Sequence, residues 1–324
     1  MSDPSSDQIL WGDKPYHSLD YELKKEYGKK IYKLSLNGGM SCPNRDGTID
    51  TNGCIFCSEG GSGDFSTPLL SSVTLQIEEA KKRVEAKLSH QEQVNYIAYF
   101  QAYSNTHASV SYLRSLFLEA ISHPDIVILS IATRPDCLPV EVLDLLSELN
   151  RIKPVWIELG LQTMHNSTAL MIRRGYPLTI FEDAVNNLNS RKIRIIVHTI
   201  LGLPKETPED MMRTIKYISN LPIWGIKLQL LHILKGTELG TMFENGDFHE
   251  TLTMNAYIEL VIACLEHLPK EMVIHRITGD GPRSLLLSPL WSTNKKLVLN
   301  RIHQTMKETY TWQGKLKKEE ANAI

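Results

Sequence analysis

The chain has 324 residues, of which 42% are hydrophobic and 22% charged, and its formal net charge is −2. This composition is typical of a globular protein, and it excludes a molecule-wide basic field, so any nucleic-acid contact must come from a local patch. No apolar stretch reaches the ~18 residues of a membrane span and the polar residues 1–8 lack a signal pattern, so we expect a cytoplasmic protein without membrane contact.

Short apolar or β-branched runs alternate with segments whose apolar residues recur three and four positions apart, which predicts alternating strands and helices. The expected strands are Ile31–Leu36, Val94–Phe100, Ile126–Ala132, Val155–Leu159, Ile193–Leu201, Ile223–Leu230 and Met272–His275. The expected helices include Leu75–Leu88, Val110–Ile121, Val140–Leu149, Phe181–Leu188 and Met211–Ile218. Thr207 and Pro208 are typical of the start of the last of these helices. Helix-length connections indicate a parallel sheet, and we expect an α/β fold that curves like a barrel instead of lying flat.

The chain divides into three parts on this interpretation. Residues 1–30 form an N-terminal extension, residues 31–290 the barrel domain, and residues 291–324 a C-terminal helical extension and tail. In parallel barrels the chemistry lies on the loops after the strands. Residues of interest follow five of the predicted strands in this way, namely Gln101–Thr106, Arg134, Gln162, Pro204 and Lys235. The pattern predicts one shared active face.

The loop after the first predicted strand carries Cys42, Cys54 and Cys57 in a C-x11-C-x2-C array. Clustered cysteines in a reducing compartment favour a metal site over disulfides. A four-iron cluster normally takes four thiolates, so three leave one iron open to chelate a methionine and pass an electron to its sulfonium. The alternatives are a structural zinc, which normally has four ligands, and unliganded thiols. Cys137 and Cys264 lie in apolar or helical contexts, so we expect them in the core.

The cysteines belong to a set of motifs that runs almost from end to end of the chain. The motifs are Trp11-Gly-Asp-Lys-Pro-Tyr-His17, Cys42-Pro-Asn-Arg-Asp-Gly47, Phe100-Gln-Ala-Tyr-Ser-Asn-Thr106, Ala132-Thr-Arg-Pro-Asp136, Glu158-Leu-Gly-Leu-Gln162, Lys235-Gly-Thr237 and His275-Arg-Ile-Thr-Gly-Asp-Gly-Pro282. With them the chain resembles the radical S-adenosylmethionine (SAM) enzymes, in the Elongator-catalytic-subunit-like branch that contains the YtqA/YhcC family. The resemblance implies an incomplete parallel β/α barrel, a [4Fe-4S] cluster on the three cysteines, and S-adenosylmethionine.

The resemblance also implies contacts to the methionine part and the ribose of S-adenosylmethionine. Gln101 and Ala102 occupy the segment whose backbone binds the methionine amino group in relatives. Gln162 corresponds to a ribose-binding glutamine. Arg174 corresponds to an arginine that pairs with the methionine carboxylate, a task that suits its planar fork. The alternative for Arg174 is a solvated cation at a helix end.

Two further parts of the cofactor site follow from the same resemblance. Some relatives carry a ribose-binding glutamate where this chain has Ala132. That contact then falls to one of three residues, Ser130, Arg134 or Glu158. The adenine pocket takes its apolar walls from Phe56, Ile200 and Leu231, although isolated aliphatic residues are more often part of the core.

Polar residues on the last two expected strands, and on the loop after the last of them, are candidates for substrate binding and catalysis. His275, Arg276 and Asp280 lie on a glycine-containing loop, which we expect at the rim of the barrel mouth. The alternative for this loop is a tight turn stabilised by Asp280. Lys227 alternates with apolar residues on the sixth strand, where it either contacts an anionic substrate group or pairs with Glu158.

For the substrate, the resemblance implies the wobble uridine in the anticodon loop of tRNA. The implied reaction converts 5-carboxymethylaminomethyl-(2-thio)uridine to 5-aminomethyl-(2-thio)uridine. It implies an electron donor such as flavodoxin or ferredoxin, and functional coupling to a tRNA methyltransferase that modifies the amine. Independently of the resemblance, the C-terminal region is rich in basic residues, among them Lys295, Lys296 and Arg301, which could contact RNA. The alternatives are a solvated basic helix, a radical enzyme for a small molecule or a protein, and a noncatalytic iron–sulfur protein that binds RNA.

Overall fold

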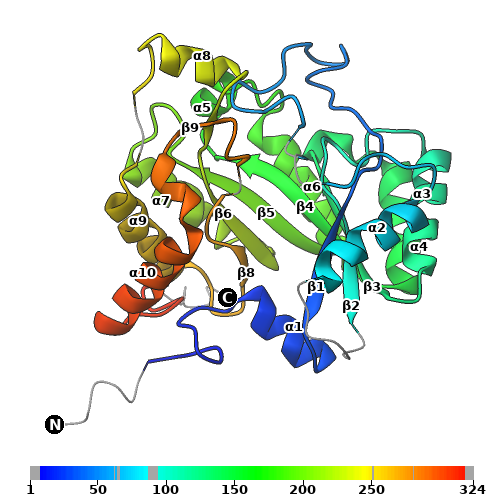
Figure 1. Ribbon diagram of the computed structural model, residues 1–324, viewed down its shortest axis with the longest axis horizontal. Helices are drawn as coiled ribbons and strands as arrows, with labels where there is room; N and C mark the ends of the chain where they lie inside the picture. Colours follow the sequence, from blue (N-terminus) through cyan, green and yellow to red (C-terminus); the bar gives the residue numbers. More distant parts are fainter. Residues whose placement is uncertain are drawn as a thin grey trace, which may run out of the picture.

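The computed structural model describes residues 8–61, 63, 66–86, 94–249, 252–279 and 281–317. Its frame is a seven-stranded sheet in the order β1-β2-β3-β4-β5-β6-β8, and every neighbouring pair in it is parallel (Figure 1). The strands are β1 (Ile31–Leu36), β2 (Asn95–Phe100), β3 (Ile126–Thr133), β4 (Val155–Gln162), β5 (Arg194–Leu201), β6 (Gly225–Leu230) and β8 (Val273–Arg276). The expected parallel sheet is confirmed, and all seven expected strands are present.

The sheet curls strongly, as a partial barrel requires. In a flat sheet, β1 and β6 would stand roughly 24 Å apart, at five strand spacings. Here Lys33 of β1 and Lys227 of β6 both bind the carboxylate of Glu158 on β4. Within the described part of the chain β1 does not pair with β8, so the barrel is incomplete.

The helices of the described chain are α1 (Leu19–Tyr27), α2 (Val73–Glu85), α3 (Val110–Ser122), α4 (Val140–Ile152), α5 (Asn166–Met171), α6 (Leu178–Ser190), α7 (Pro208–Ile218), α8 (Glu238–Glu244), α9 (Met254–His267) and α10 (Lys295–Glu308). Most of the helices that the structure describes lie along the outside of this sheet, while α1 and α8 lie near its two ends (Figure 1). Two short strands, β7 (Ile233–Leu234) and β9 (Leu286–Ser288), form an antiparallel pair. Among the helices that the structure describes, none has the length and apolar character needed to cross a membrane.

The end of the barrel where the strands begin is closed by α1. This helix contacts both edge strands, and Ser18 just before it forms a parallel bridge with Ile274 of β8. Leu23 of α1 packs in an apolar cluster with Trp156 and Ile196. The barrel is therefore filled at this end, and the site described below lies toward the other end.

Candidate active site

The loop between β1 and α2 brings the three clustered cysteines to the open end of the barrel. Cys42, Cys54 and Cys57 are all half-buried and line one cavity of about 250 Å³. Cys137 and Cys264 are fully buried, as expected of core residues. The three clustered thiols therefore line the cavity, whereas the thiols of Cys137 and Cys264 do not.

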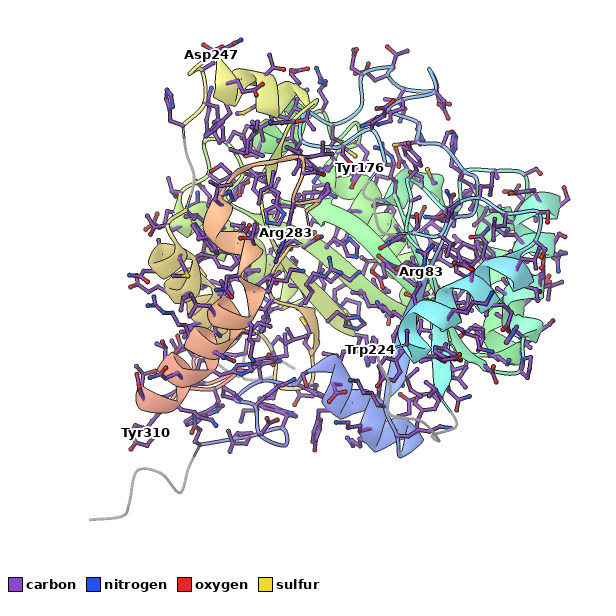
Figure 2. The ribbon with its side chains drawn as sticks, in the orientation of Figure 1. Arg83, Tyr176, Trp224, Asp247, Arg283 and Tyr310 are labelled. Carbon is purple, nitrogen blue, oxygen red and sulfur yellow. The ribbon has the colours of Figure 1, made fainter. Side chains whose placement is uncertain are left out.

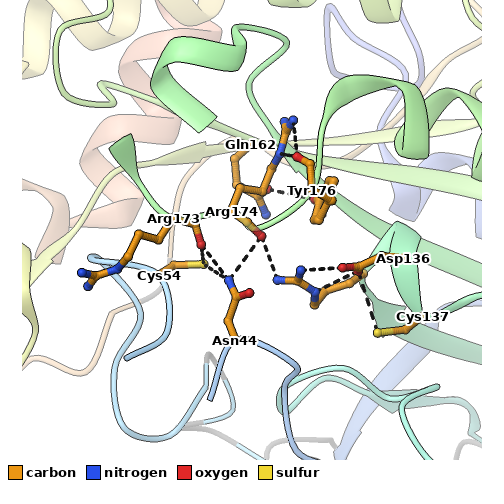
Figure 3. Close-up of polar contacts among 10 residues, drawn as sticks. Asn44, Cys54, Asp136, Cys137, Gln162, Arg173, Arg174 and Tyr176 are labelled. Atoms are coloured by element: carbon orange, nitrogen blue, oxygen red, sulfur yellow. Dashed lines mark hydrogen bonds and ion pairs between the residues drawn. The ribbon is translucent and has the colours of Figure 1, made fainter. Parts of the chain in front are cut away.

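Asn44 fastens this cysteine loop to the turn between α5 and α6 (Figure 3). Its side chain is buried and donates to the carbonyl oxygens of Arg173 at 2.7 Å and Arg174 at 3.2 Å. The same amide nitrogen donates to the Cys54 Sγ at 3.6 Å. Gly175 lies against this contact with a φ of +84°, and a Cβ at this position would stand 2.4 Å from the Asn44 Oδ1. The loop is therefore held in place by a close approach that only glycine permits.

The arrangement of the thiols fits an iron–sulfur cluster better than a zinc ion. No three His, Cys, Asp or Glu side chains of the described residues are placed to hold a single metal ion. A tetrahedral zinc needs its ligands to converge on one point. In a four-iron cluster each thiolate binds a different iron, so its cysteines need only surround a common space. Cys42, Cys54 and Cys57 meet that requirement because they line one cavity.

Arg174 is buried beside the cysteine loop, but its guanidinium is already occupied. It donates to the carbonyl oxygens of Leu161 at 2.9 Å, Thr163 at 2.7 Å and Tyr176 at 3.1 Å. Arg134 forms an ion pair with Asp136 and donates to the Arg174 carbonyl at 2.9 Å. These contacts favour a role for Arg174 in holding the turn, where the sequence suggested a contact to the methionine carboxylate.

Gln162 ends β4 in an uncommon backbone conformation. Its φ is +63°, and the pairing of β4 with β5 shifts register between Gly160 and Gln162. Tyr176 donates a hydrogen bond to the Gly160 carbonyl and so supports this bend. Non-glycine residues at positive φ persist where their surroundings over-determine them, often at ligand sites. Gln162 lines the cavity, where the sequence placed a ribose contact.

The apolar residues expected around adenine lie together. Phe56, Ile200 and Leu231 belong to one apolar cluster and line the cavity that contains the cysteines. Gln101 also lines the cavity, and the neighbouring Ala102 is buried. The cavity thus has one wall of apolar side chains beside the thiols.

The interior of the barrel contains a charged network centred on Glu158, which is fully buried. Its Oε1 accepts from Lys33 Nζ and Ser130 Oγ, both at 2.8 Å. Its Oε2 accepts from His198 Nε2 at 2.7 Å and forms an ion pair with Lys227. Burial opposes ionisation of Glu158, but Lys227, Lys33 and His198 together hold the pKa of this carboxyl well below its usual range. The Glu158 carboxylate is therefore occupied by hydrogen bonds and ion pairs, and Ser130 donates to it. Of the three candidates for the ribose contact, Arg134 is the one that lies outside this network.

His275 does not lie at the rim of the barrel mouth, and that expectation is wrong. It is the extra residue of a β-bulge, because Ile226 pairs with Ile274 while Lys227 pairs with Arg276. The bulge turns the His275 ring onto Trp156 and Trp224, with ring centroids 5.6 and 5.2 Å away.

His275 and Arg276 lie in different parts of the barrel relative to the cysteine loop. Figure 2 shows Trp224 at the end near α1 and Tyr176 at the opposite end. His275 therefore lies at the closed end. Arg276 lines the cavity, and its contact with substrate stays a prediction. Asp280 lies outside the described residues.

Several residues of the site were not predicted from the sequence. Lys33 and His198 had a usable signal, because polar residues interrupt strands that are otherwise buried, and central parallel strands are usually apolar throughout. Asn44 and Tyr176 had no such signal, since their roles depend on segments distant in sequence. Tyr99 accepts from the Lys227 ammonium at 3.0 Å, and a tyrosine in a buried strand does not stand out.

Comparisons with known proteins agree with this geometry. Residues 51–218 match the Radical SAM superfamily, and residues 223–308 match the Radical_SAM C-terminal domain. The chain is 45% identical over 303 residues to the Uncharacterized protein YtqA of Bacillus subtilis (strain 168), covering 94% of this chain and 93% of YtqA. It is 26% identical over 172 residues to a tRNA uridine(34) acetyltransferase of Methanocaldococcus infernus, covering 52% of this chain and 31% of that protein.

A solved structure confirms the fold. The archaeal Methanocaldococcus infernus Elp3 with an N-terminal deletion superposes with a TM-score of 0.66 at 15% identity, over 87% of this chain. The match spans 64% of that Elp3 chain, which is less than two thirds of its length. The incomplete parallel barrel is shared between the two proteins.

Proposed function

Because this chain belongs to the radical SAM superfamily, we propose that it modifies the wobble uridine of tRNA, converting 5-carboxymethylaminomethyl-(2-thio)uridine to 5-aminomethyl-(2-thio)uridine. The chain is an enzyme that cleaves S-adenosylmethionine with a [4Fe-4S] cluster. Cys42, Cys54 and Cys57 would hold the cluster. When bound, the two cofactors would supply a 5′-deoxyadenosyl radical, the species that takes a hydrogen atom from the substrate.

The observation that carries the tRNA assignment is a basic cavity next to the cysteine cavity. This second cavity, of about 480 Å³, is lined by Arg283, Lys295 and Lys296. It shares His232 and two glycines with the first cavity. A nucleotide whose base enters the first cavity can therefore place a backbone phosphate in the second, since phosphates are contacted mainly by Lys and Arg. The name of the M. infernus relative adds that a similar protein acts on tRNA uridine 34.

The conversion balances with S-adenosylmethionine as the oxidant. The methylene between nitrogen and carboxylate would lose a hydrogen atom to the 5′-deoxyadenosyl radical and an electron to the oxidised cluster, which replaces the electron used to cleave S-adenosylmethionine. Loss of a proton then leaves an imine. Water adds to the imine carbon, the carbon–nitrogen bond breaks, and the amine and glyoxylate are released. One S-adenosylmethionine is consumed and becomes methionine and 5′-deoxyadenosine. A radical on this methylene is favourable because nitrogen and carboxylate stabilise it from both sides.

The experiment is a comparison of tRNA nucleosides from cells with and without the gene. Loss of the gene should raise carboxymethylaminomethyl-uridine and lower the aminomethyl and methylaminomethyl forms. The reconstituted, reduced enzyme should release one glyoxylate for each aminomethyl-uridine formed. An unchanged nucleoside profile, in a strain without a second pathway, would contradict the tRNA assignment and leave the radical chemistry standing.

A further inference from the structure

Lys227 on β6 is a lysine that lies inside the barrel and lines the cysteine cavity. Its side chain is 4% exposed, yet it borders the same cavity as Cys42, Cys54 and Cys57. Among the described residues that line this cavity, it is the only lysine. With the thiols bound to iron, Lys227 supplies the amine nucleophile of the cavity.

The Lys227 nitrogen keeps one position open besides its two hydrogen bonds. It donates to the Tyr99 hydroxyl at 3.0 Å and to the Glu158 Oε2. The described residues give it no third hydrogen-bond partner. An ammonium group has three hydrogens, whereas a neutral amine has two hydrogens and a lone pair. Neutral Lys227 can therefore keep both contacts while its lone pair is free to attack.

The surroundings of Lys227 favour the loss of its proton. Burial lowers the pKa of Lys227 well below its usual range, although the Glu158 carboxylate opposes this shift. Glu158 also binds Lys33 at 2.8 Å and accepts from His198 at 2.7 Å. It therefore retains a cation and a hydrogen-bond donor when Lys227 is neutral. A desolvated lysine of this kind is suited to act as an amine nucleophile.

We propose that Lys227 is a catalytic residue that forms an imine with the two-carbon unit removed from the uridine side chain. This inference rests on the proposed function and deepens it, because it assigns the group that frees the product amine. The reaction proposed above produces a substrate imine in the cavity that Lys227 lines. An amine held in the same cavity reacts with that imine without being brought from solvent.

The exchange balances without an oxidant or a reductant. The Lys227 ammonium gives a proton to the substrate imine nitrogen, and the neutral amine then adds to the imine carbon. After a second proton passes from Lys227 to the substrate nitrogen, the bond between this nitrogen and the carbon breaks. Aminomethyl-uridine leaves, and the two-carbon unit remains on Lys227 as an imine. Water adds one step later, releases glyoxylate and restores the Lys227 ammonium.

The test traps the imine with sodium borodeuteride, which converts it to a stable amine that carries deuterium on the former imine carbon. Cluster-loaded, reduced enzyme is mixed with S-adenosylmethionine and an anticodon stem-loop that contains carboxymethylaminomethyl-uridine. The mixture is quenched during a single turnover, and mass spectrometry locates deuterium in peptides and nucleosides. In the wild-type enzyme, most of the trapped deuterium should lie in a carboxymethyl group on Lys227, and Lys25 should carry none.

Lys227→Arg is the informative variant, because it retains a cation for Glu158 but cannot form an imine. Its trapped deuterium should move from the chain to the RNA, as deuterated carboxymethylaminomethyl-uridine, since the substrate imine is then the species that meets borodeuteride. Lys25→Arg changes an exposed lysine of α1 in the same way and should leave the label on Lys227. If Lys227→Arg loses its cluster or its Tm falls, the position of the label in the wild-type enzyme decides the question.

The outcomes separate this inference from the proposed function. Deuterium that appears only in the RNA of the wild-type reaction, or on lysines other than Lys227, would overturn the role of Lys227, while glyoxylate release would still support the tRNA reaction. If the stem-loop does not react at all, the tRNA assignment fails and glyoxylate itself decides the question. Glyoxylate with sodium cyanoborohydride should then carboxymethylate Lys227 before Lys25 in the cluster-loaded enzyme without RNA, and the opposite order would overturn the imine.

Discussion

Gly175 is a single residue on which the position of the cysteine loop depends. Its φ of +84° and the 2.4 Å approach of its Cβ position to the Asn44 Oδ1 leave no room for a side chain. Gly175→Ala should therefore push Asn44 away from Arg173 and Arg174 and lower iron incorporation during anaerobic reconstitution. The measurement is the iron content and visible absorbance per chain.

A matched control for this variant is Gly28→Ala, at the end of α1. Gly28 has a φ of +70°, but no atom lies within 4 Å of its Cβ position. Both alanines are subject to left-handed strain of about 1–2 kcal/mol, and only Gly175→Ala meets the asparagine. Normal iron content in both variants would contradict the role assigned to the Asn44 contact.

The five cysteines should fall into two groups when they are replaced by alanine one at a time. Cys42, Cys54 and Cys57 line the cavity, so each of their variants should lose the cluster absorbance and the production of 5′-deoxyadenosine. Cys137 and Cys264 are buried away from it, so their variants should retain both, with some loss of stability from the smaller side chain. Stoichiometric zinc in a fully active enzyme would contradict the cluster assignment.

Among the elements, α1 stabilises the barrel because it packs across the gap between the two edge strands. Leu23 is 3% exposed and is its buried anchor. Leu23→Ala should lower the free energy of unfolding by about 2–5 kcal/mol, measured by urea denaturation. Lys25→Ala, on the exposed side of the same helix, should leave it nearly unchanged. An equal effect of the two variants would mean that α1 adds little to the barrel core.

Elements with a clear periodicity were predicted from the sequence, and those without one were not. The seven strands and helices α2, α3, α4, α6 and α7 were expected, and Thr207 caps α7 together with Asp210 as its sequence suggested. The α9 helix was missed because seven of its residues are buried, so it has no clear polar face. The two-residue strand β7 and the short helices α5 and α8 are below the length at which a period can be recognised.

At the scale of the whole molecule, sequence motifs predicted the cofactor end of the site better than the barrel interior. The cysteine spacing is local, so it is visible in the sequence. The Glu158 network draws side chains from β1, β3, β5 and β6, and the contact between Lys33 and Glu158 joins residues 125 positions apart. Only the curl of the sheet brings these residues together. The bulge that moves His275 to the closed end is likewise set by the pairing of β8 with β6.

If the proposed function holds, the surface that binds RNA should extend from the barrel mouth onto the start of α10. Lys295 and Lys296 line the basic cavity, and Arg301 follows on the same helix. Burial and the nearby Arg276 lower the pKa of Lys295 to about 8, so it is mostly protonated at pH 7 and loses its charge as the pH rises toward 9. A phosphate contact from Lys295 should therefore weaken over this range.

Each phosphate contact releases counterions, so the affinity for an anticodon stem-loop should fall linearly with salt on logarithmic axes. Lys296→Ala should reduce the magnitude of this slope by about 0.7–0.9, the value for one lost contact. Raising the pH from 7 to 9 should reduce it further, because Lys295 is then neutral. Lys25→Ala at the closed end should leave the slope as it is in the wild type. If Lys296→Ala and Lys25→Ala give the same slope, the backbone does not cross α10, and the basic cavity has no part in holding the RNA.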